Sequence, residues 1–320
     1  MGIKITYLDG TNYENGCKFG QSYADGIHEH SAKAFLGLDP LKEKLKARYP
    51  ETYAEVQGRA AGAGADFDAY LSNICYEISG GCTDILRPGR LAHNEDDFYT
   101  LENIGLVRES LPGGRYLCYF VSPDCLAGAA FGWSDRLAWS TNFIDTDRFN
   151  YDGMPVWFVM RDLCVSESVA EIQEKLRRTS VMSGFSFNVT EVDSGRTWNI
   201  ERYLDEENDL EVKSLYVHTN HILRMNVSQP AVAGSTLFRY NKTQELLAGL
   251  PSAPSDDEAL KILGYSGVCR NNSIRDRGTD GHVTAATFLF APGDIRIRSW
   301  LDKTEYRLSQ DMSKIEKSPL

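Results

Sequence analysis

The sequence predicts an α+β fold in which two mostly antiparallel sheets stack face to face, with helices on their outer faces. Two patterns along the 320 residues support this prediction. Apolar residues recur at helical spacing in several segments, while other runs are rich in β-branched and aromatic residues and end at turn signals. The strand-like runs cluster as hairpins and the helical segments come in pairs, an order that suits stacked layers.

Each element follows from its local pattern. Residues 1–7 are typical of a short strand, in which Ile3 and Ile5 pack on one face. Apolar spacing predicts helices at 15–35, 41–62, 67–74, 155–164, 168–178 and 235–247, with a further helix starting near Asp257. Strands are predicted at 83–86, 91–94, 115–121, 128–133, 136–142, 184–191, 197–202, 210–218, 283–291 and 294–300.

The composition is that of a globular protein with a sizeable core. Hydrophobic residues make up 42% of the chain and charged residues 25%. The sequence has no repeat, low-complexity tract or long linker, so we expect one domain over residues 1–320. A net charge of -11 makes nucleic acid and anionic membranes unfavourable partners, because both would repel this surface.

Cysteine usage and the N-terminal residues favour a cytoplasmic protein. The seven cysteines are odd in number and lack paired spacings, which fits a reducing compartment better than a disulfide framework. The N-terminal residues lack the long apolar stretch of a signal peptide. Self-association into a homo-oligomer is left open by the sequence.

The dipeptide Gly81-Cys82 carries the strongest chemical signal. A thiol beside the carbonyl of a flexible glycine can attack it, form a thioester and, after hydrolysis, leave a cysteine with a free α-amine. The amine titrates near about 8 and the thiol near about 8.5, so the amine can act as the base for its own sulfur. We therefore expect cleavage after Gly81, with residues 1–81 as a propeptide and 82–320 beginning at the nucleophile.

The residues after Cys82 predict a hairpin that returns acidic side chains to the sulfur. Pro88-Gly89 is a turn signal between two short strand-like runs. In a hairpin centred there, Cys82 lies opposite Glu95. The acidic run Glu95-Asp96-Asp97 then lies beside the thiol and its amine, where a carboxylate can hold a protonated amine and assist proton transfer.

Further motifs occur in the same order as in a known enzyme family. They are Tyr53–Gly64, which ends in Gly-Ala-Gly, then Asn73 and Glu77 before Gly-Cys-Thr, His93–Asp96, Trp139–Asn142 and Val217–His221. On these motifs the chain resembles the acyl-coenzyme A:isopenicillin N acyltransferase-like family of N-terminal nucleophile (Ntn) cysteine hydrolases. The resemblance runs from about Tyr53 to Ile222, and more loosely to Trp300. It implies the four-layer αββα sandwich of the Ntn-hydrolase fold.

The resemblance also implies roles for matched residues. Cys82 would be the nucleophile, and Asp96 would orient its amine and support processing. Asn142 and Asn220 would stabilise the oxyanion, because a preorganised amide can donate to the negative oxygen of a tetrahedral intermediate. The family's late arginine has three candidates in this sequence, which are Arg239, Arg275 and Arg277.

Two departures from the family pattern make the mouth of the site more acidic. Asp84 follows Gly-Cys-Thr where the family has a small residue, and Glu95 and Asp97 stand at aromatic positions. These carboxylates favour a cationic or amine-bearing substrate over the family's typical ones.

The expected function is self-processing followed by acyl transfer or hydrolysis at an amide or thioester, through an acyl-Cys82 intermediate. The partners would be a small-molecule acyl donor, such as an N-acyl amino acid, peptide, amine or acyl-coenzyme A, and water or an amine as acceptor. No cofactor is expected. Two alternatives stay open: an uncleaved thiol hydrolase with His218 or His221 as base, and a non-catalytic small-molecule-binding protein on the same scaffold.

Three groups of metal-ligand residue types are weak, so no metal is expected. His218 and His221 would point to opposite faces of a strand, and His28-Glu29-His30 lacks a third ligand. The acidic run 145–152 lacks the glycine and the terminal glutamate of a calcium loop.

Overall fold

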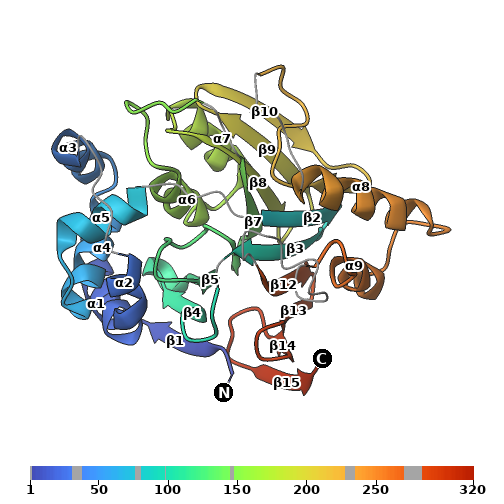
Figure 1. The fold of residues 1–320 in the computed structure, drawn as a ribbon, viewed down its shortest axis with the longest axis horizontal. Coiled ribbons are helices and arrows are strands. Elements are labelled where there is room, and N and C mark those ends of the chain that lie inside the picture. Colours follow the sequence, from blue (N-terminus) through green and yellow to red (C-terminus); the bar gives the residue numbers. More distant parts are fainter. Residues whose placement is uncertain are drawn as a thin grey trace.

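Two stacked sheets with helices on both outer faces form the framework that positions the site (Figure 1). The structure is a computed structural model, and it describes residues 2–30, 38–75, 81–97, 99–144, 148–227, 235–269 and 283–320. In the described residues, no helix has the length and apolar character needed to cross a membrane.

The first sheet has eight strands in the order β1-β4-β5-β6-β7-β8-β9-β10. Only β1 and β4 pair in parallel, and the other neighbours are antiparallel. The strands are β1 (Lys4–Leu8), β4 (Gly105–Ser110), β5 (Tyr116–Val121), β6 (Phe131–Ser134), β7 (Leu137–Ile144), β8 (Gly184–Glu191), β9 (Thr197–Tyr203) and β10 (Glu206–Glu211).

The second sheet has seven strands in the order β11-β2-β3-β12-β13-β14-β15, and every neighbouring pair is antiparallel. The strands are β2 (Gly81–Arg87), β3 (Arg90–Asp97), β11 (Tyr216–His218), β12 (Val283–Ala291), β13 (Asp294–Ser299), β14 (Thr304–Leu308) and β15 (Ile315–Pro319).

The helices divide between the two outer faces. Seven pack beside the eight-stranded sheet: α1 (Asn12–Ser22), α2 (Ala24–His30), α3 (Leu38–Arg48), α4 (Pro50–Ala63), α5 (Phe67–Cys75), α6 (Val156–Cys164) and α7 (Val169–Arg177). Two cover the other sheet: α8 (Ser235–Ala248) and α9 (Asp256–Leu263). A short 3₁₀ helix, η1 (Pro112–Gly114), precedes β5.

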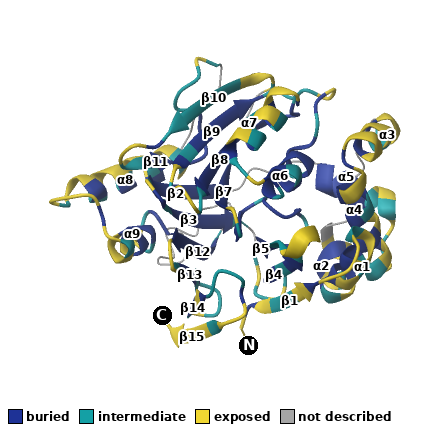
Figure 2. Cartoon of the chain, turned by 180° about the vertical axis from the view of Figure 1, so that it is seen from behind, coloured by how far each residue is buried: buried dark blue, intermediate teal, exposed yellow. Residues whose placement is uncertain are grey.

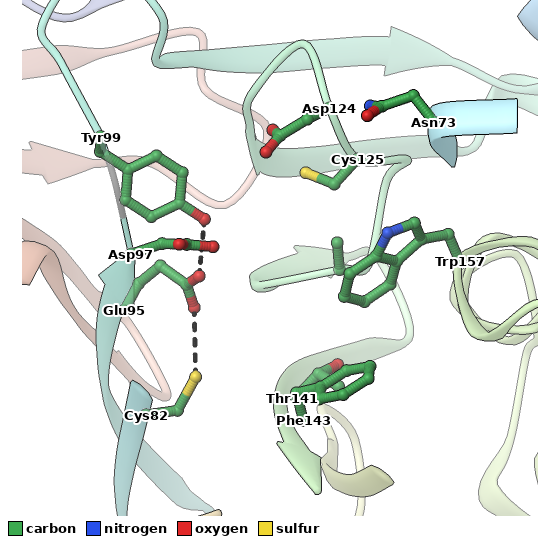
Figure 3. A pocket seen from close by; sticks show the side chains of 11 residues that line it. Asn73, Cys82, Glu95, Asp97, Tyr99, Asp124, Cys125, Thr141, Phe143 and Trp157 are labelled. Atoms are coloured by element: carbon green, nitrogen blue, oxygen red, sulfur yellow. Dashed lines mark hydrogen bonds between the residues drawn. The ribbon is translucent and has the colours of Figure 1, made fainter. Parts of the chain in front are cut away.

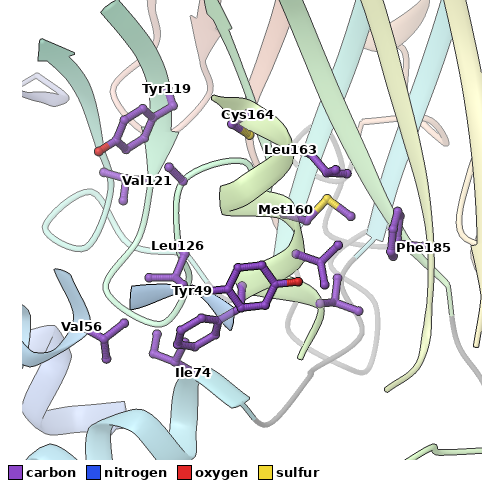
Figure 4. Packing of buried hydrophobic residues seen from close by; sticks show 14 of the residues in the cluster. Tyr49, Val56, Ile74, Tyr119, Val121, Leu126, Met160, Leu163, Cys164 and Phe185 are labelled. Carbon is purple, nitrogen blue, oxygen red and sulfur yellow. The ribbon is translucent and has the colours of Figure 1, made fainter. Parts of the chain in front are cut away.

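Three apolar layers hold these elements together. Side chains such as Val56, Met160 and Phe185 join the helices to the eight-stranded sheet (Figure 4). Phe131 stacks on Phe288 of the other sheet, with ring centroids 4.6 Å apart, in the layer between the sheets. The third layer packs α8 and α9 against β2, β3, β11 and β12. Figure 2 shows buried residues concentrated in the central strands, while much of α3 and α8 is exposed.

The predicted fold class is confirmed, and most predicted elements occur close to their expected bounds. The helix expected at 41–62 is two helices, because Pro50 begins α4 and supplies no N–H to an extension of α3. Gly64 then ends α4 in the left-handed conformation, at φ 67°, as a Gly-Ala-Gly ending suggests. The helix expected at 15–35 is likewise divided, into α1 and α2, and its last residues, 31–35, lie outside the described residues.

One predicted strand was wrong in an informative way. The run 210–218 divides into the end of β10 in one sheet and β11 in the other, so the chain crosses between sheets within it. The sequence analysis also missed β4, β14 and β15. The polar side chains of β15, which are largely exposed at an edge, weaken the strand pattern there.

Candidate active site

The β2–β3 hairpin has the predicted register. Gly89 has a φ of 72°, which a glycine adopts readily in a tight turn. Cys82 pairs with Glu95 and Asp84 pairs with His93, as a turn at Pro88-Gly89 requires. The strand register expected from the sequence is therefore confirmed.

Alternation along the hairpin places four chemically active side chains on one face. Cys82 and Asp84 belong to β2, and His93 and Glu95 to β3; we call these four residues the hairpin cluster. Their face is turned toward the eight-stranded sheet, because Ser140 of β7 donates a hydrogen bond to the Asp84 carboxylate. The intervening residues point to the opposite face, toward α8 and α9.

A chain of hydrogen bonds links the members of the hairpin cluster. The Cys82 thiol donates to Oε2 of Glu95 at 3.6 Å (Figure 3). His93 Nε2 lies 3.0 Å from the same oxygen. His93 Nδ1 lies 3.1 Å from both oxygens of Asp84. The Tyr99 hydroxyl donates to Oε1 of Glu95 at 2.7 Å. All four members are buried, and His93 and Asp84 are fully so.

These contacts determine the charge of the hairpin cluster. Burial opposes protonation of His93, but Asp84 and Glu95 outweigh it and raise the pKa of the imidazole to about 10. His93 is therefore a cation held between two carboxylates at neutral pH. Burial, followed by the charge of Glu95, raises the pKa of the Cys82 thiol well above its usual value. In this arrangement the sulfur keeps its proton until a base removes it.

The main chain of Cys82 is held by side chains from distant segments. Its N–H donates to Oδ1 of Asn220 at 2.8 Å, although Asn220 is 138 residues further along the chain. Arg239 of α8 donates to the same Oδ1 at 2.7 Å and also to the carbonyl oxygen of Cys82. Both donors require the amide oxygen of Asn220 to face them, so the Asn220 NH₂ group points to the Phe143 carbonyl oxygen, 2.9 Å away.

Asn142 reaches the hairpin cluster from β7 but does not line the pocket above it. Its NH₂ group donates to Asp84, and its Oδ1 lies 3.0 Å from Asn188 Nδ2 and 3.2 Å from His218 Nδ1. Its strand neighbours Thr141 and Phe143 line the pocket instead. The oxyanion roles of Asn142 and Asn220 stay predictions, and both residues already hold partners around Cys82.

Asp96 lies on the other face of the hairpin from the thiol. It pairs with Gly81, its Oδ1 accepts a hydrogen bond from Thr284, and its Oδ2 lies 3.9 Å from Arg239 Nε. The expected contact between the acidic run and the sulfur is therefore made by Glu95, because successive strand residues face opposite sides. The role of Asp96 in orienting the amine stays a prediction.

His93, which the sequence analysis did not select, is the imidazole of the hairpin cluster. The two histidines considered as bases have other partners: His218 Nε2 lies 3.0 Å from Glu201, and His221 Nδ1 lies 3.0 Å from the Thr236 hydroxyl. The hairpin register could have identified His93, since it places residue 93 opposite Asp84 on the face of Cys82.

The thiol opens into a pocket with one acidic and one aromatic side. Glu95, Asp97 and Asp124 contribute carboxylates, while Phe143 and Trp157 form an aromatic wall with ring centroids 5.8 Å apart (Figure 3). Trp157 belongs to the aromatic segment that starts α6. A pocket of this kind can hold an apolar acyl group against the aromatic wall and a cationic group near the carboxylates.

The metal motifs considered from sequence do not form ligand sets in the described part of the chain. Residues 145–147, the side chain of His30, and the arginine candidates Arg275 and Arg277 lie outside it. Of the three arginine candidates, Arg239 contacts Cys82. Among the described residues, the metal-type ligand atoms of Cys82, His93 and Glu95 lie within 4.8 Å of one another.

A family model described as acyl-coenzyme A:6-aminopenicillanic acid acyl-transferase matches residues 87–306, which is more than half of the chain. No curated protein matches the sequence.

Two solved structures are similar to this chain. An N-acylethanolamine-hydrolyzing acid amidase (NAAA) ortholog from Caenorhabditis elegans is similar with a TM-score of 0.47 and 14% identity, covering 66% of this chain and 93% of that one. A mutant conjugated bile acid hydrolase from Clostridium perfringens is similar with a TM-score of 0.48 and 13% identity, covering 75% of this chain and 97% of that one.

Proposed function

Because this chain belongs to the acyl-coenzyme A:6-aminopenicillanic acid acyl-transferase family of Ntn cysteine hydrolases, we propose that it cleaves itself before Cys82 and then uses that residue as an N-terminal nucleophile. The mature enzyme transfers or hydrolyses an acyl group through an acyl-Cys82 thioester. Its partners are a small-molecule acyl donor and water or an amine, and it acts in the cytoplasm.

The hydrogen bond from the Cys82 main-chain nitrogen to Asn220 carries this proposal. This nitrogen is held by a side chain at 2.8 Å, and cleavage would convert it into the α-amine without moving it. Arg239 donates to the same amide oxygen, so a guanidinium lies beside the future amine. A neighbouring positive charge favours the neutral amine, which is the form that can take the thiol proton.

In the proposed self-cleavage step, Cys82 is the nucleophile and Glu95 the first proton acceptor. The Cys82 sulfur attacks the carbonyl carbon of Gly81 as its proton passes to Glu95, the nearest carboxylate. The bond to the Cys82 nitrogen breaks as that nitrogen takes a proton, and a thioester remains. Water then attacks the thioester, releasing the Gly81 carboxylate and regenerating the thiol.

The pocket supports amide or thioester substrates that combine an acyl chain with a cationic group. The acyl chain would lie on Trp157 and Phe143, and the amine of a donor or acceptor would lie near Asp124. N-acyl amino acids, small peptides, acylated amines and acyl-coenzyme A are the classes to assay. Water exclusion in the acylated state decides between hydrolysis and transfer.

Intact mass under denaturing, reducing conditions tests the proposal directly. Wild type should give fragments of 81 and 239 residues, while Cys82→Ala stays whole. Fragments in both proteins would assign the cut to another protease. A wild-type chain that stays whole after long incubation would remove the amine-as-base mechanism.

A second function is favoured by the shared contact of His93 and the thiol with Glu95. In an uncleaved thiol hydrolase, Glu95 would accept the thiol proton, and His93, held by Asp84 through Nδ1, would position that carboxylate. Turnover by a chain that is whole by mass, and its loss in His93→Gln, would favour this function. Turnover that requires the cleaved form would exclude it.

A further inference from the structure

We propose that Cys82, His93 and Glu95 form a Zn²⁺ site, and that a bound ion withholds the thiol from acyl transfer. The second half of this proposal rests on the proposed function, whereas the metal site itself does not. The site arises because the hairpin register brings one sulfur, one imidazole and one carboxylate together on the same face.

The ligand atoms match the chemistry and size of a zinc centre. Zn²⁺ is borderline-soft and takes thiolate, imidazole and carboxylate ligands at about 2.0 to 2.3 Å, which puts tetrahedral ligand atoms about 3.4 to 3.6 Å apart. Cys82 Sγ lies 3.6 Å from Glu95 Oε2, and His93 Nε2 lies 3.0 Å from that oxygen. All three ligand atoms lie within 4.8 Å of one another, so movements of up to about 1 Å would complete three corners of a tetrahedron.

The surroundings of the three ligands are those of a metal centre. A histidine that binds a metal through one ring nitrogen usually donates a hydrogen bond from the other to a carboxylate, carbonyl or water, which fixes the ring. His93 does so, since its Nδ1 lies 3.1 Å from Asp84, while its Nε2 faces Glu95 Oε2, where the ion would replace the shared proton. Tyr99 holds the second oxygen of Glu95 at 2.7 Å, which fixes that carboxylate as well.

The fourth corner faces the pocket. Cys82 and Glu95 line the pocket while His93 is fully buried behind them, so the open position points toward solvent. A protein with three ligands and one open position binds a water there. On binding, Zn²⁺ replaces the thiol proton and the proton between His93 and Glu95. The sulfur lone pair is then committed to the ion, and the nucleophile is blocked.

Metal titration of the tag-free full chain tests the site. Bound metals are first removed with a chelator, and Zn²⁺ is then titrated in. Wild type should retain one Zn²⁺ per chain through gel filtration. Co²⁺ in its place should give a thiolate-to-metal charge-transfer band. Cys82→Ala, His93→Gln and Glu95→Gln should each lose more affinity than the about 10- to 100-fold expected from Asp84→Asn, because Asp84 acts through His93. Thermal unfolding and intact mass are recorded for each variant.

Cys125→Ala is the matched control, since Cys125 is a buried thiol lining the same pocket outside the ligand set. Retention of zinc by Cys82→Ala, loss of zinc by Cys125→Ala, or a folded wild type that retains no zinc would overturn the site. Zinc bound at one per chain without loss of turnover would overturn the inhibitory role. A chain that never cleaves would contradict the proposed function while leaving the metal readout intact.

Discussion

Two buried clusters of ionisable side chains lie on opposite faces of the eight-stranded sheet, and they differ in charge balance. The hairpin cluster sets two carboxylates against one imidazolium and a thiol. On the helical side, two carboxylates meet two guanidiniums, and we call these four residues the helix-layer cluster. Its members are Glu55, Arg59, Glu109 and Arg161.

Every residue of the helix-layer cluster has at least one ion-pair partner. Arg161 bridges Glu55 at 2.9 Å and Glu109 at 2.8 Å, and Arg59 lies 2.7 Å from Glu55. It joins α4, β4 and α6. Burial raises the pKa of Glu55, but Arg161 and Arg59 outweigh burial and hold that pKa below its usual value.

The difference separates a structural cluster from a reactive one. In the helix-layer cluster each carboxylate faces a guanidinium, so removing one partner would leave a buried charge uncompensated, whereas the carboxylates around Cys82 raise the pKa of its thiol and leave a reactive group short of positive charge. Substitution of Cys82 in the hairpin cluster should lower activity with little loss of stability, whereas substitution of Arg161 in the helix-layer cluster should lower stability.

The largest effect is expected from Cys82→Ala. Loss of an essential nucleophile lowers turnover by about 10⁶-fold in well-studied hydrolases, and here it should abolish self-cleavage as well. The free energy of unfolding should change by no more than about 1 kcal/mol, because one sulfur atom next to a pocket is removed. Turnover is measured with an acyl-donor panel and stability by denaturant titration. Substantial residual turnover would place the nucleophile elsewhere.

Arg161→Met should break the balanced cluster. Removing the shared cation leaves Glu55 and Glu109 buried without it, and such a loss costs about 3 to 5 kcal/mol of stability. Denaturant titration measures this cost. Arg178→Met is the control, because Arg178 pairs with Glu174 at the surface and its loss should cost less than about 1 kcal/mol. Equal losses of stability in Arg161→Met and Arg178→Met would show that the buried ion pairs of Arg161 are no more important to the fold than a surface pair.

Asn220→Ala should slow self-cleavage by about 10- to 100-fold. The substitution removes the acceptor for the Cys82 nitrogen and for Arg239, and hydrogen bonds to charged groups contribute about 1.5 to 3 kcal/mol. Freshly synthesised protein is followed by intact mass over time. Asn241→Ala, at an exposed position of α8, should cleave at the wild-type rate. An unchanged cleavage rate in Asn220→Ala would show that the contact between Asn220 and the Cys82 nitrogen is not needed for self-cleavage.

Glu95→Gln should change the free energy of unfolding by no more than about 1 kcal/mol. Glutamine has the same shape, and its amide oxygen can accept from His93 while its NH₂ group donates to the Tyr99 hydroxyl. The change also removes one negative charge from a cluster with excess negative charge. Denaturant titration beside Arg161→Met gives the comparison. A loss as large as that of Arg161→Met would show that Glu95 is structural.

Much of the fold could be predicted because its signals are local. The hairpin turn at Pro88-Gly89 and the start of α9, capped by Ser255 and Glu258, each depend on residues close together in the sequence. The break at Pro50 is equally local, but the prediction ran one helix through it. The segment 210–218 was mispredicted because a crossing between sheets leaves the strand pattern intact while changing its partner.

The candidate site divides along the same line. The sequence alone determined the Gly81-Cys82 pair and the meeting of Cys82 with Glu95, since turn geometry sets the pairing of a short hairpin. Only the tertiary structure decided that Asn220 and Arg239 hold the Cys82 main chain and that Asn142 donates to Asp84. These three contacts join residues 58 to 157 positions apart. They depend on how sheets and helices stack, because no short-range pattern encodes the packing of one layer on another.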